Sequence, residues 1–232
     1  MGKLSIFDQV KKEDRFILTE FESKRILKQA GISVVETKLA KTQKEAVSLS
    51  QKMGFPVALK ITSPDVIHKS DSGGVKLSLN NGSEVKKAYD EILKKVRKQY
   101  PDAVVHGVSV QKMIRPGTEV IVGTSKDPQF GPVIMFGLGG IFVELLKDVS
   151  FRVIPVERRD AQEMIKEIKG YPLLQGYRGK EPANISALVE IILKISKLIE
   201  ENPQIKELEL NPIFAFGDKA VAVDARIILE KG

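Results

Sequence analysis

The sequence predicts an α+β protein built from two lobes. Segments with the alternation of strands and segments with the period of helices follow one another along the chain, and their spacing differs between the two halves. The 232 residues suffice for two lobes of about 100 residues, each with its own core. Neither half contains an internal repeat or a low-complexity tract, which argues against a solenoid and against a disordered chain.

Composition excludes several kinds of site. The chain has no cysteine, which rules out disulfides, thiolate catalysis and cysteine-based metal sites. Its two histidines, His68 and His106, are too few for a histidine-rich metal site, so any metal would be a hard cation held by oxygen ligands. No apolar run approaches the roughly 18 to 20 residues of a membrane-spanning helix, and no export signal is recognisable. We therefore expect a cytoplasmic protein with no membrane partner.

Charge indicates an anionic partner without choosing one. The net charge of +7 fits a nucleotide, phosphate or nucleic acid. Most of the excess lysine lies in segments of helical period mixed with glutamate, which is typical of solvated amphipathic faces. The low aromatic content and the absence of DNA or RNA motifs argue against a nucleic-acid partner.

Helix and strand signals can be placed along most of the chain. The first 18 residues have mixed charges and no clear period, so we expect a loose or partner-dependent arm there. Thr19 to Ala30 predicts a helix that begins with a Thr19–Glu22 capping box and ends at Gly31. The other predicted elements are strands at 34–40, 56–61, 73–79, 104–114, 118–126, 132–136, 151–156, 206–216 and 220–228, and helices at 42–53, 83–99, 160–168 and 185–201.

Lys60 lies at the end of the apolar run PVALK. A lysine on the inner face of a buried strand is costly unless its ammonium group meets an anion, so a phosphate or carboxylate partner is expected. The alternative is a lysine at a strand end whose side chain reaches solvent.

The loop ITSPDVIHKSDSGGVKL holds His68 between two predicted strands. Imidazole can act as a base, ligand or nucleophile near neutral pH, and Lys69 and Asp71 could steady a phosphate and orient the ring respectively. A single loop histidine can equally be only a solvated residue. Gly73 and Gly74 would let the backbone approach a phosphate closely, although a β-bulge or a tight start of the next strand explains a glycine pair as well.

The segment FGLGGIFVELLKD imitates a dinucleotide-binding fingerprint. It offers Gly137, Gly139 and Gly140 after a predicted strand, but Phe142 replaces the third glycine of the motif. The interval before the next strand is also too short for a crossover helix. We therefore do not expect a Rossmann site.

Near the C-terminus, oxygen-bearing side chains lie on adjacent predicted strands. Glu209 and Asn211 are two residues apart, so both project from one face, and a paired antiparallel strand would bring Asp224 opposite them. Carboxylate and amide oxygens without histidine or cysteine suit Mg²⁺, which substrate phosphates would complete. The alternative is the outward polar alternation of a half-buried sheet.

Taken in this order, the motifs resemble those of one family. LKITSPDVIHKSDSGGVKL, then GTEVIVGTSKDPQFGPVIMFGLGGIFVELLKDVSFRVIPV and LELNPI, resemble the ATP-grasp subunits of the nucleoside-diphosphate-forming acyl-CoA synthetases, in particular the β subunits of the ADP-forming acetyl-CoA synthetases. The resemblance runs from about Leu18 to the C-terminus. It implies the ATP-grasp fold, with a nucleotide bound between two α+β lobes, and divides the chain into an arm at 1–18, a helix at 19–34 that packs on the second lobe, a first lobe at 35–112 with a phosphohistidine loop at 62–74, and a second lobe at 113–232.

The resemblance also implies a role for each candidate residue. Lys60 would contact nucleotide phosphate, and Glu119 would lie near the nucleotide. His68 would carry the phosphoryl group within a loop that contains Lys69, Asp71, Gly73 and Gly74. Glu209 would act beside the Mg²⁺ ligands Asn211 and Asp224. The backbone that meets adenine would be that of Gln111, Lys112 and Met113.

The reaction implied is acyl-CoA + ADP + phosphate giving acid + CoA + ATP, reversibly. The chain lacks a CoA-binding region, so it would need a CoA-binding α subunit, in an α₂β₂ heterotetramer. Two alternatives remain open. One is an ATP-grasp carboxylate ligase that forms an acyl phosphate directly, and the other is a non-catalytic nucleotide-binding regulator.

Overall fold

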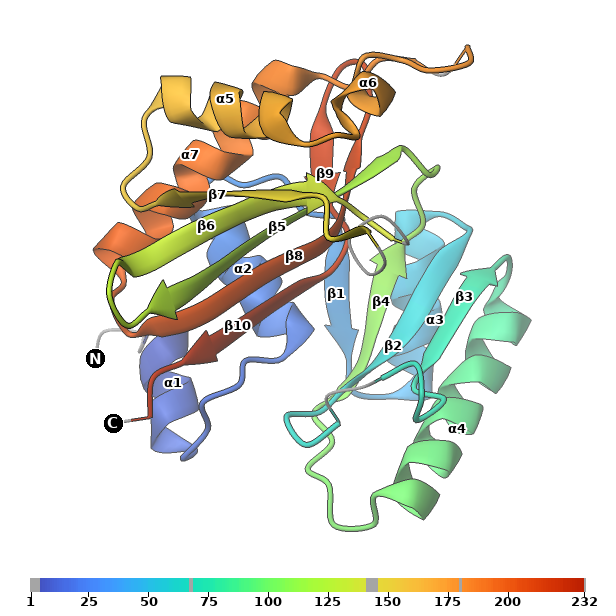
Figure 1. The fold of residues 1–232 in the computed structure, drawn as a ribbon. Coiled ribbons are helices and arrows are strands. Elements are labelled where there is room, and N and C mark those ends of the chain that lie inside the picture. The colour runs from blue at the N-terminus through green and yellow to red at the C-terminus, as the bar shows by residue number, and fades with distance from the viewer. Residues whose placement is uncertain (1–4, 67–68, 141–145, 180, 232) are drawn as a thin grey trace. The chain divides into compact units, whose positions relative to one another are not determined.

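A computed structural model describes residues 5–66, 69–140, 146–179 and 181–231. Its helices are α1 (Ile6–Lys12), α2 (Glu20–Gln29), α3 (Gln43–Met53), α4 (Gly82–Gln99), α5 (Arg158–Glu167), α6 (Tyr171–Leu174) and α7 (Ile185–Glu201). Its strands are β1 (Thr37–Ala40), β2 (Val57–Thr62), β3 (Val75–Leu79), β4 (Gly107–Lys112), β5 (Thr118–Asp127), β6 (Gly131–Leu138), β7 (Val149–Val153), β8 (Ile205–Ala215), β9 (Ala220–Ala222) and β10 (Ala225–Leu229). Figure 1 shows these elements along the chain.

The chain divides into two compact units, each with its own sheet and core. Unit 1 comprises residues 1–18, 23–34 and 116–232, and unit 2 comprises residues 19–22 and 35–115. The predicted α+β class is confirmed, because each unit combines one antiparallel sheet with helices. Among the residues with described structure, no helix is long and apolar enough to cross a membrane.

Unit 2 is a four-stranded antiparallel sheet in the order β1-β4-β2-β3. Leu59 and Ile61 of β2 share a buried cluster with α3 and α4, so these two helices cover one face of the sheet (Figure 1). Because side chains alternate along a strand, Lys60 projects from the opposite face. That face is also buried, since every residue of β2 is buried.

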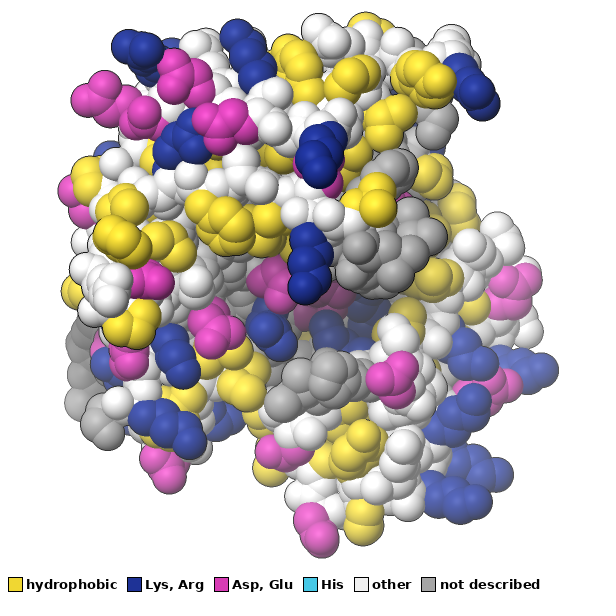
Figure 2. Space-filling view, viewed as in Figure 1, with side chains coloured by type: hydrophobic (Ala, Val, Ile, Leu, Met, Phe, Trp, Pro, Cys, Tyr) yellow, Lys and Arg dark blue, Asp and Glu magenta, His cyan; other side chains and the backbone are white. Residues whose placement is uncertain are grey.

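The lysine-rich outer face of α4 matches the solvated surface expected from its sequence. Val85, Ile92 and Val96 are buried at helical spacing, whereas the lysines between them are exposed. Figure 2 shows a gathering of Lys and Arg side chains over this helix, interspersed with acidic ones.

Unit 1 is built on a six-stranded antiparallel sheet. Its main order is β10-β8-β5-β6-β7, and β9 pairs with β8. One face carries the large cluster of buried side chains that α1, α2, α5 and α7 share with the strands. The other face has exposed apolar side chains at its β7 edge, where Phe151 is 56% and Val153 is 48% exposed.

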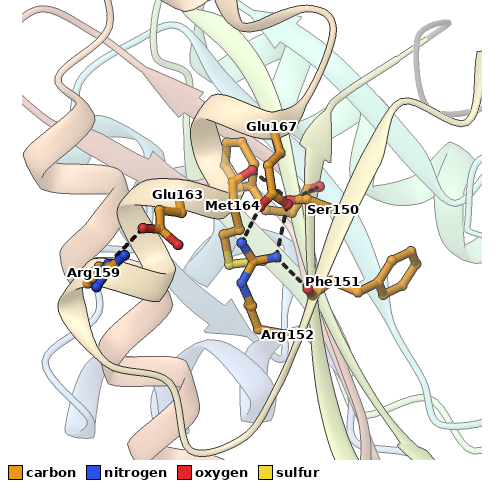
Figure 3. Close-up of polar contacts among 8 residues, drawn as sticks. Ser150, Phe151, Arg152, Arg159, Glu163, Met164 and Glu167 are labelled. Carbon is orange, nitrogen blue, oxygen red and sulfur yellow. Dashed lines mark hydrogen bonds and ion pairs between the residues drawn. The ribbon is translucent and has the colours of Figure 1, made fainter.

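The junction between β7 and α5 holds a buried hydroxyl and an exposed ion pair (Figure 3). Ser150 Oγ donates to the carbonyl oxygen of Met164 at 2.7 Å. The Arg152 guanidinium makes two hydrogen bonds to the Glu167 carboxylate, which raise the pKa of Arg152 above its ordinary value and lower that of Glu167. Arg152 therefore links α5 to the edge strand β7.

The expectation of a loose N-terminal arm is wrong for residues 5–12. Ser5 and Asp8 form a capping box at the start of α1, and Ile6 and Val10 are buried in the core of unit 1. A helix of seven residues is too short to produce a clear period in the sequence, which is why the signal was missed. The long strand expected at 220–228 is divided into β9 and β10.

Candidate active site

Lys60 of unit 2 is a buried charged residue with a carboxylate partner. Its ammonium group lies 2.8 Å from Oε1 of Glu20, and the two side chains are only 9% and 5% exposed. The expectation that this buried ammonium meets an anion is confirmed, with a carboxylate as the partner. Ser109 Oγ donates to the carbonyl oxygen of Lys60 at 3.2 Å, which ties the residue to β4 as well.

The same carboxylate binds a second lysine from the loop after β2. Lys69 Nζ lies 2.6 Å from Oε2 of Glu20, so one carboxylate joins the ammonium groups of Lys60 and Lys69. His68, the predicted phosphate carrier, lies outside the described residues. Asp71 is exposed.

Hydrogen bonds fix the backbone just after Lys69. The carbonyl oxygen of Lys69 accepts from Ser72 Oγ at 2.9 Å and from the amide of Gly74 at 2.7 Å, and Ile61 N donates to the carbonyl oxygen of Gly74 at 2.7 Å. Before the loop, Asp65 accepts a hydrogen bond from Val104 N at 2.7 Å. Both flanks of the predicted carrier position are thus tied to the body of unit 2.

Backbone conformation and close packing explain why Gly73 and Gly74 are glycines. Gly73 has a φ of +66°, a conformation that side chains disfavour. A Cβ on Gly74 would lie 2.5 Å from Cγ2 of Ile61, so only glycine fits against β2. The tight start of β3, which the sequence left open as an explanation, therefore accounts for both residues; contact with a phosphate stays a prediction.

The segment predicted to meet adenine is hydrogen-bonded to other parts of unit 2. The amides of Lys112 and Met113 donate to the carbonyl oxygens of Glu36 and Pro56, both at 3.1 Å. Lys112 Nζ also donates to the carbonyl oxygen of Gly54 at 2.7 Å. Gln111 is buried. An adenine contact here would have to use other groups of the segment than these two amides.

In unit 1, Glu119 lies next to the glycines that imitate a dinucleotide fingerprint. Gly139 N donates to the carbonyl oxygen of Glu119 at 2.8 Å, and a Cβ on Gly140 would lie 3.4 Å from Glu119 Oε2. The preceding strand, β6, pairs antiparallel with both β5 and β7, so it is not part of a βαβ unit. The expectation that this is no Rossmann site is confirmed.

The predicted oxygen ligands meet at one end of the β8–β10 ladder. Asn211 Nδ2 donates to Oε1 of Glu209 at 3.3 Å. The last residue pair of the ladder is Ala225 with Leu210, so Asp224 lies level with Asn211. Asn211 is exposed and Asp224 is half-buried. The strand register therefore places the three side chains that the sequence singled out at the same end of the ladder.

The chemistry of this donor set fits Mg²⁺. An amide oxygen and carboxylates are hard ligands, and two protein ligands leave positions for water and phosphate oxygens. In the described part of the chain, no group of three or more His, Cys, Asp or Glu residues could hold a metal ion alone. Asn211 and Asp224 would thus form an incomplete site that a phosphate-bearing substrate completes, and their role as Mg²⁺ ligands stays a prediction.

Sequence reasoning missed two charged residues, Glu20 and Arg226. Glu20 is the first residue of α2, where an acidic residue is already explained by the helix dipole. Arg226 lies opposite Glu209, with Nη2 3.5 Å from Oε2 of that residue, and lines a shallow groove of about 270 Å³ with Gly123 and Met135. The alternation of β10 could have found Arg226, since it lies two residues after Asp224.

Comparison with known proteins identifies the class of this fold. Residues 9–229 match the ATP-grasp domain family, so the chain belongs to that family. The predicted ATP-grasp fold is therefore confirmed.

Closer relatives narrow the class. The chain is 54% identical over 224 residues to the β subunit of acetate–CoA ligase (ADP-forming) I from Pyrococcus furiosus, covering 97% of this chain and 96% of that one. It is 47% identical to acetate–CoA ligase (ADP-forming) I from Archaeoglobus fulgidus, of which it spans 30%. Within the ATP-grasp proteins, the chain belongs to the family of β subunits of ADP-forming acetate–CoA ligases, as its resemblance to the ADP-forming acetyl-CoA synthetases implied.

One solved structure of a similar protein has a phosphorylated phosphohistidine segment. The protein is acetyl-coenzyme A synthetase 1 of Candidatus Korarchaeum cryptofilum, described as complexed with coenzyme A and acetyl-coenzyme A and having a phosphorylated phosphohistidine segment. It superposes with a TM-score of 0.91 at 46% identity, covering 97% of this chain and 98% of that one. Another structure of the same enzyme holds Mg-AMPPCP, with that segment pointing towards the nucleotide-binding site.

Proposed function

We propose that this chain moves a phosphoryl group between ADP and a CoA-binding α subunit, with His68 as the carrier. The reaction is acyl-CoA + ADP + phosphate giving acid + CoA + ATP, in either direction. The observation that carries the proposal is the joining of Lys69, the residue after His68, to the buried strand lysine Lys60 through one carboxylate. This contact ties Lys69, which follows the proposed carrier in the sequence, to the cation expected to bind phosphate.

The chain's own residues supply the groups that phosphoryl transfer requires. Such transfer needs positioning and charge neutralisation more than covalent help. Lys60 and Lys69 offer ammonium groups to phosphate oxygens, and Asn211 and Asp224 would hold Mg²⁺, which neutralises phosphate charge when bound. A nitrogen of the His68 imidazole forms a bond to phosphorus while the bond to the departing ADP oxygen breaks.

The need for a partner is supported by the lengths of the relatives. The chain spans nearly all of a subunit named β and only 30% of a single-chain ligase of the same kind. The remaining part of the reaction, which includes CoA binding, is assigned to an α subunit. We propose an α₂β₂ assembly.

The chain's two histidines provide a matched test. Turnover of acetyl-CoA with ADP and phosphate is measured in the complex reconstituted with a CoA-binding partner, for His68→Ala and for His106→Ala. We expect the first variant to lose turnover by about a thousandfold or more, and the second to retain it. Intact turnover in His68→Ala would instead favour a ligase that forms its acyl phosphate directly. No turnover in the wild-type complex would favour a regulator.

A further inference from the structure

Glu20 is the centre of a buried three-residue cluster in unit 2. Its two carboxylate oxygens bind different lysines, Oε1 binding Lys60 at 2.8 Å and Oε2 binding Lys69 at 2.6 Å. The exposed fractions of the side chains are 5% for Glu20, 9% for Lys60 and 20% for Lys69. Coulomb forces are screened less in such surroundings than at the surface, so the arrangement has a marked effect on any anion that enters it.

The backbone fixes each member of the cluster. Lys60 lies in β2, which pairs with a strand on each side. The carbonyl oxygen of Lys69 is held by Ser72 and Gly74, as described above. Glu20 begins α2 directly after Thr19, whose amide and hydroxyl both donate to the Glu22 carboxylate at 2.8 Å. The cluster is therefore built into the fold.

A carboxylate shared in this way keeps two ammonium groups close together against their mutual repulsion. Several phosphate oxygens of a nucleotide could then meet both ammonium groups at once. Each ammonium has three N–H donors, so Glu20 and a phosphate can bind it together. Glu20 still competes with the phosphate electrostatically, because its negative charge offsets that of the lysines and repels the phosphate.

We propose that Glu20 is a positioning residue for the phosphoryl transfer step. It holds the ammonium group of Lys69 beside that of Lys60, so that both groups meet the phosphate in one orientation during the transfer. This inference rests on the proposed function, in which Lys60 binds nucleotide phosphate and His68 receives the phosphoryl group. Because Glu20 also competes with that phosphate, it speeds the transfer while weakening nucleotide binding.

The variant Glu20→Gln tests both effects, because it keeps the size of the side chain and removes its charge. We expect the Kd for ATP, measured by calorimetry on the full chain, to fall about threefold to tenfold. We expect the rate of label transfer from saturating γ-labelled ATP with Mg²⁺ to fall about tenfold or more, since a phosphoryl group held in the wrong orientation reacts slowly. Tighter binding with slower transfer is a pattern that a purely structural role would not give.

A double-mutant cycle tests whether Glu20 acts through Lys69. Lys69→Met alone should slow the transfer to a similar extent, and adding Glu20→Gln should slow it little further, because both remove one contact. Additive losses, or a transfer rate unchanged in Glu20→Gln, would overturn the proposal. The matched control is Glu91→Gln, which removes a carboxylate that lies 2.6 Å from Lys76 in the same unit and should change neither quantity.

Two further measurements keep the outcome interpretable. If Glu20→Gln does not fold, Glu20→Asp retains the charge but is too short to reach both lysines, and its transfer rate should fall while the chain stays folded. If the wild-type chain takes up no label at His68, the proposed function fails. The ATP affinity of Glu20→Gln then still decides whether this carboxylate competes with phosphate, and an unchanged or weaker affinity would reject that part of the inference.

Discussion

The candidate residues of unit 2 and those of unit 1 differ in how far contacts within the folded protein hold them in place. In unit 2, Lys60 and Lys69 are held by a buried carboxylate, with side chains 9% and 20% exposed. In unit 1, Asn211 is exposed and Asp224 half-buried, at the end of a ladder. The fold itself holds the two lysines together, whereas the proposed site of Asn211 and Asp224 would be completed only by Mg²⁺ and phosphate.

Among the substitutions at described residues, the largest effect is expected from Lys60→Met. The variant removes a buried positive charge that the account assigns to nucleotide phosphate, so the rate of label transfer from ATP should fall by roughly 10²-fold or more. A matched control is Lys76→Met, which removes a partly exposed strand lysine of the same unit. Transfer within threefold of the wild-type rate in Lys60→Met would contradict the assignment.

Gly74→Ala tests whether the loop backbone must stay close to β2. The added Cβ would lie 2.5 Å from Ile61 Cγ2. Either the strand or the loop must shift, which should lower the free energy of unfolding in urea by about 2 kcal/mol. At Gly123 the nearest atom is the flexible Met135 methyl group at 3.4 Å, so Gly123→Ala should be nearly neutral. Equal effects of the two substitutions would show that the approach to β2 is not tight.

Asp224→Asn tests the incomplete oxygen site. Replacing a charged ligand by a neutral one should raise the Mg²⁺ concentration needed for half-maximal label transfer about tenfold, with a smaller effect on transfer at saturating Mg²⁺. Asp218→Asn, at an exposed position paired with Lys219, is the control. An unchanged Mg²⁺ requirement in Asp224→Asn would argue for the alternative in which these residues are only the polar face of a sheet.

The smallest effect concerns Glu167, whose pKa the Arg152 hydrogen bonds hold below its ordinary value of 4.5. A carboxylate with a lowered folded-state pKa contributes stability that is fully present above 4.5 and is lost as the pH falls through the lowered value. Because half of the side chain is exposed, we expect less than about 1 kcal/mol. Thermal melts should show Glu167→Gln slightly less stable than wild type at pH 7, with the difference vanishing once the pH is below the lowered pKa of Glu167. A difference that persists at low pH would contradict the ionic origin.

Local signals in the sequence were sufficient for most of the fold. Thr19 with Glu22 marks the start of α2, and Thr42 and Gly54 mark the two ends of α3. These signals can be read from the sequence because a cap depends only on residues close to the helix end. The short helix α1 was missed because it makes fewer than two full turns of pattern. Its capping box was present in the sequence, and its burial depends on distant strands.

The candidate site was only partly predictable. The position of Asp224 level with Asn211 followed from strand alternation and from the expected antiparallel pairing of the last two predicted strands, and β10 does pair antiparallel with β8. The role of Glu20 could not be predicted, because it is 40 residues from Lys60 and only the tertiary fold joins them. The cytoplasmic location and the boundaries of the expected lobes stay predictions.

The most direct measurement is the location of the phosphoryl group after the full chain is incubated with Mg²⁺ and γ-labelled ATP. We predict an acid-labile label on the peptide that contains His68. The label should be absent in His68→Ala and present in His106→Ala. A label on another residue, or no label on the wild-type chain under conditions where ATP binds, would contradict the claim that His68 carries phosphate.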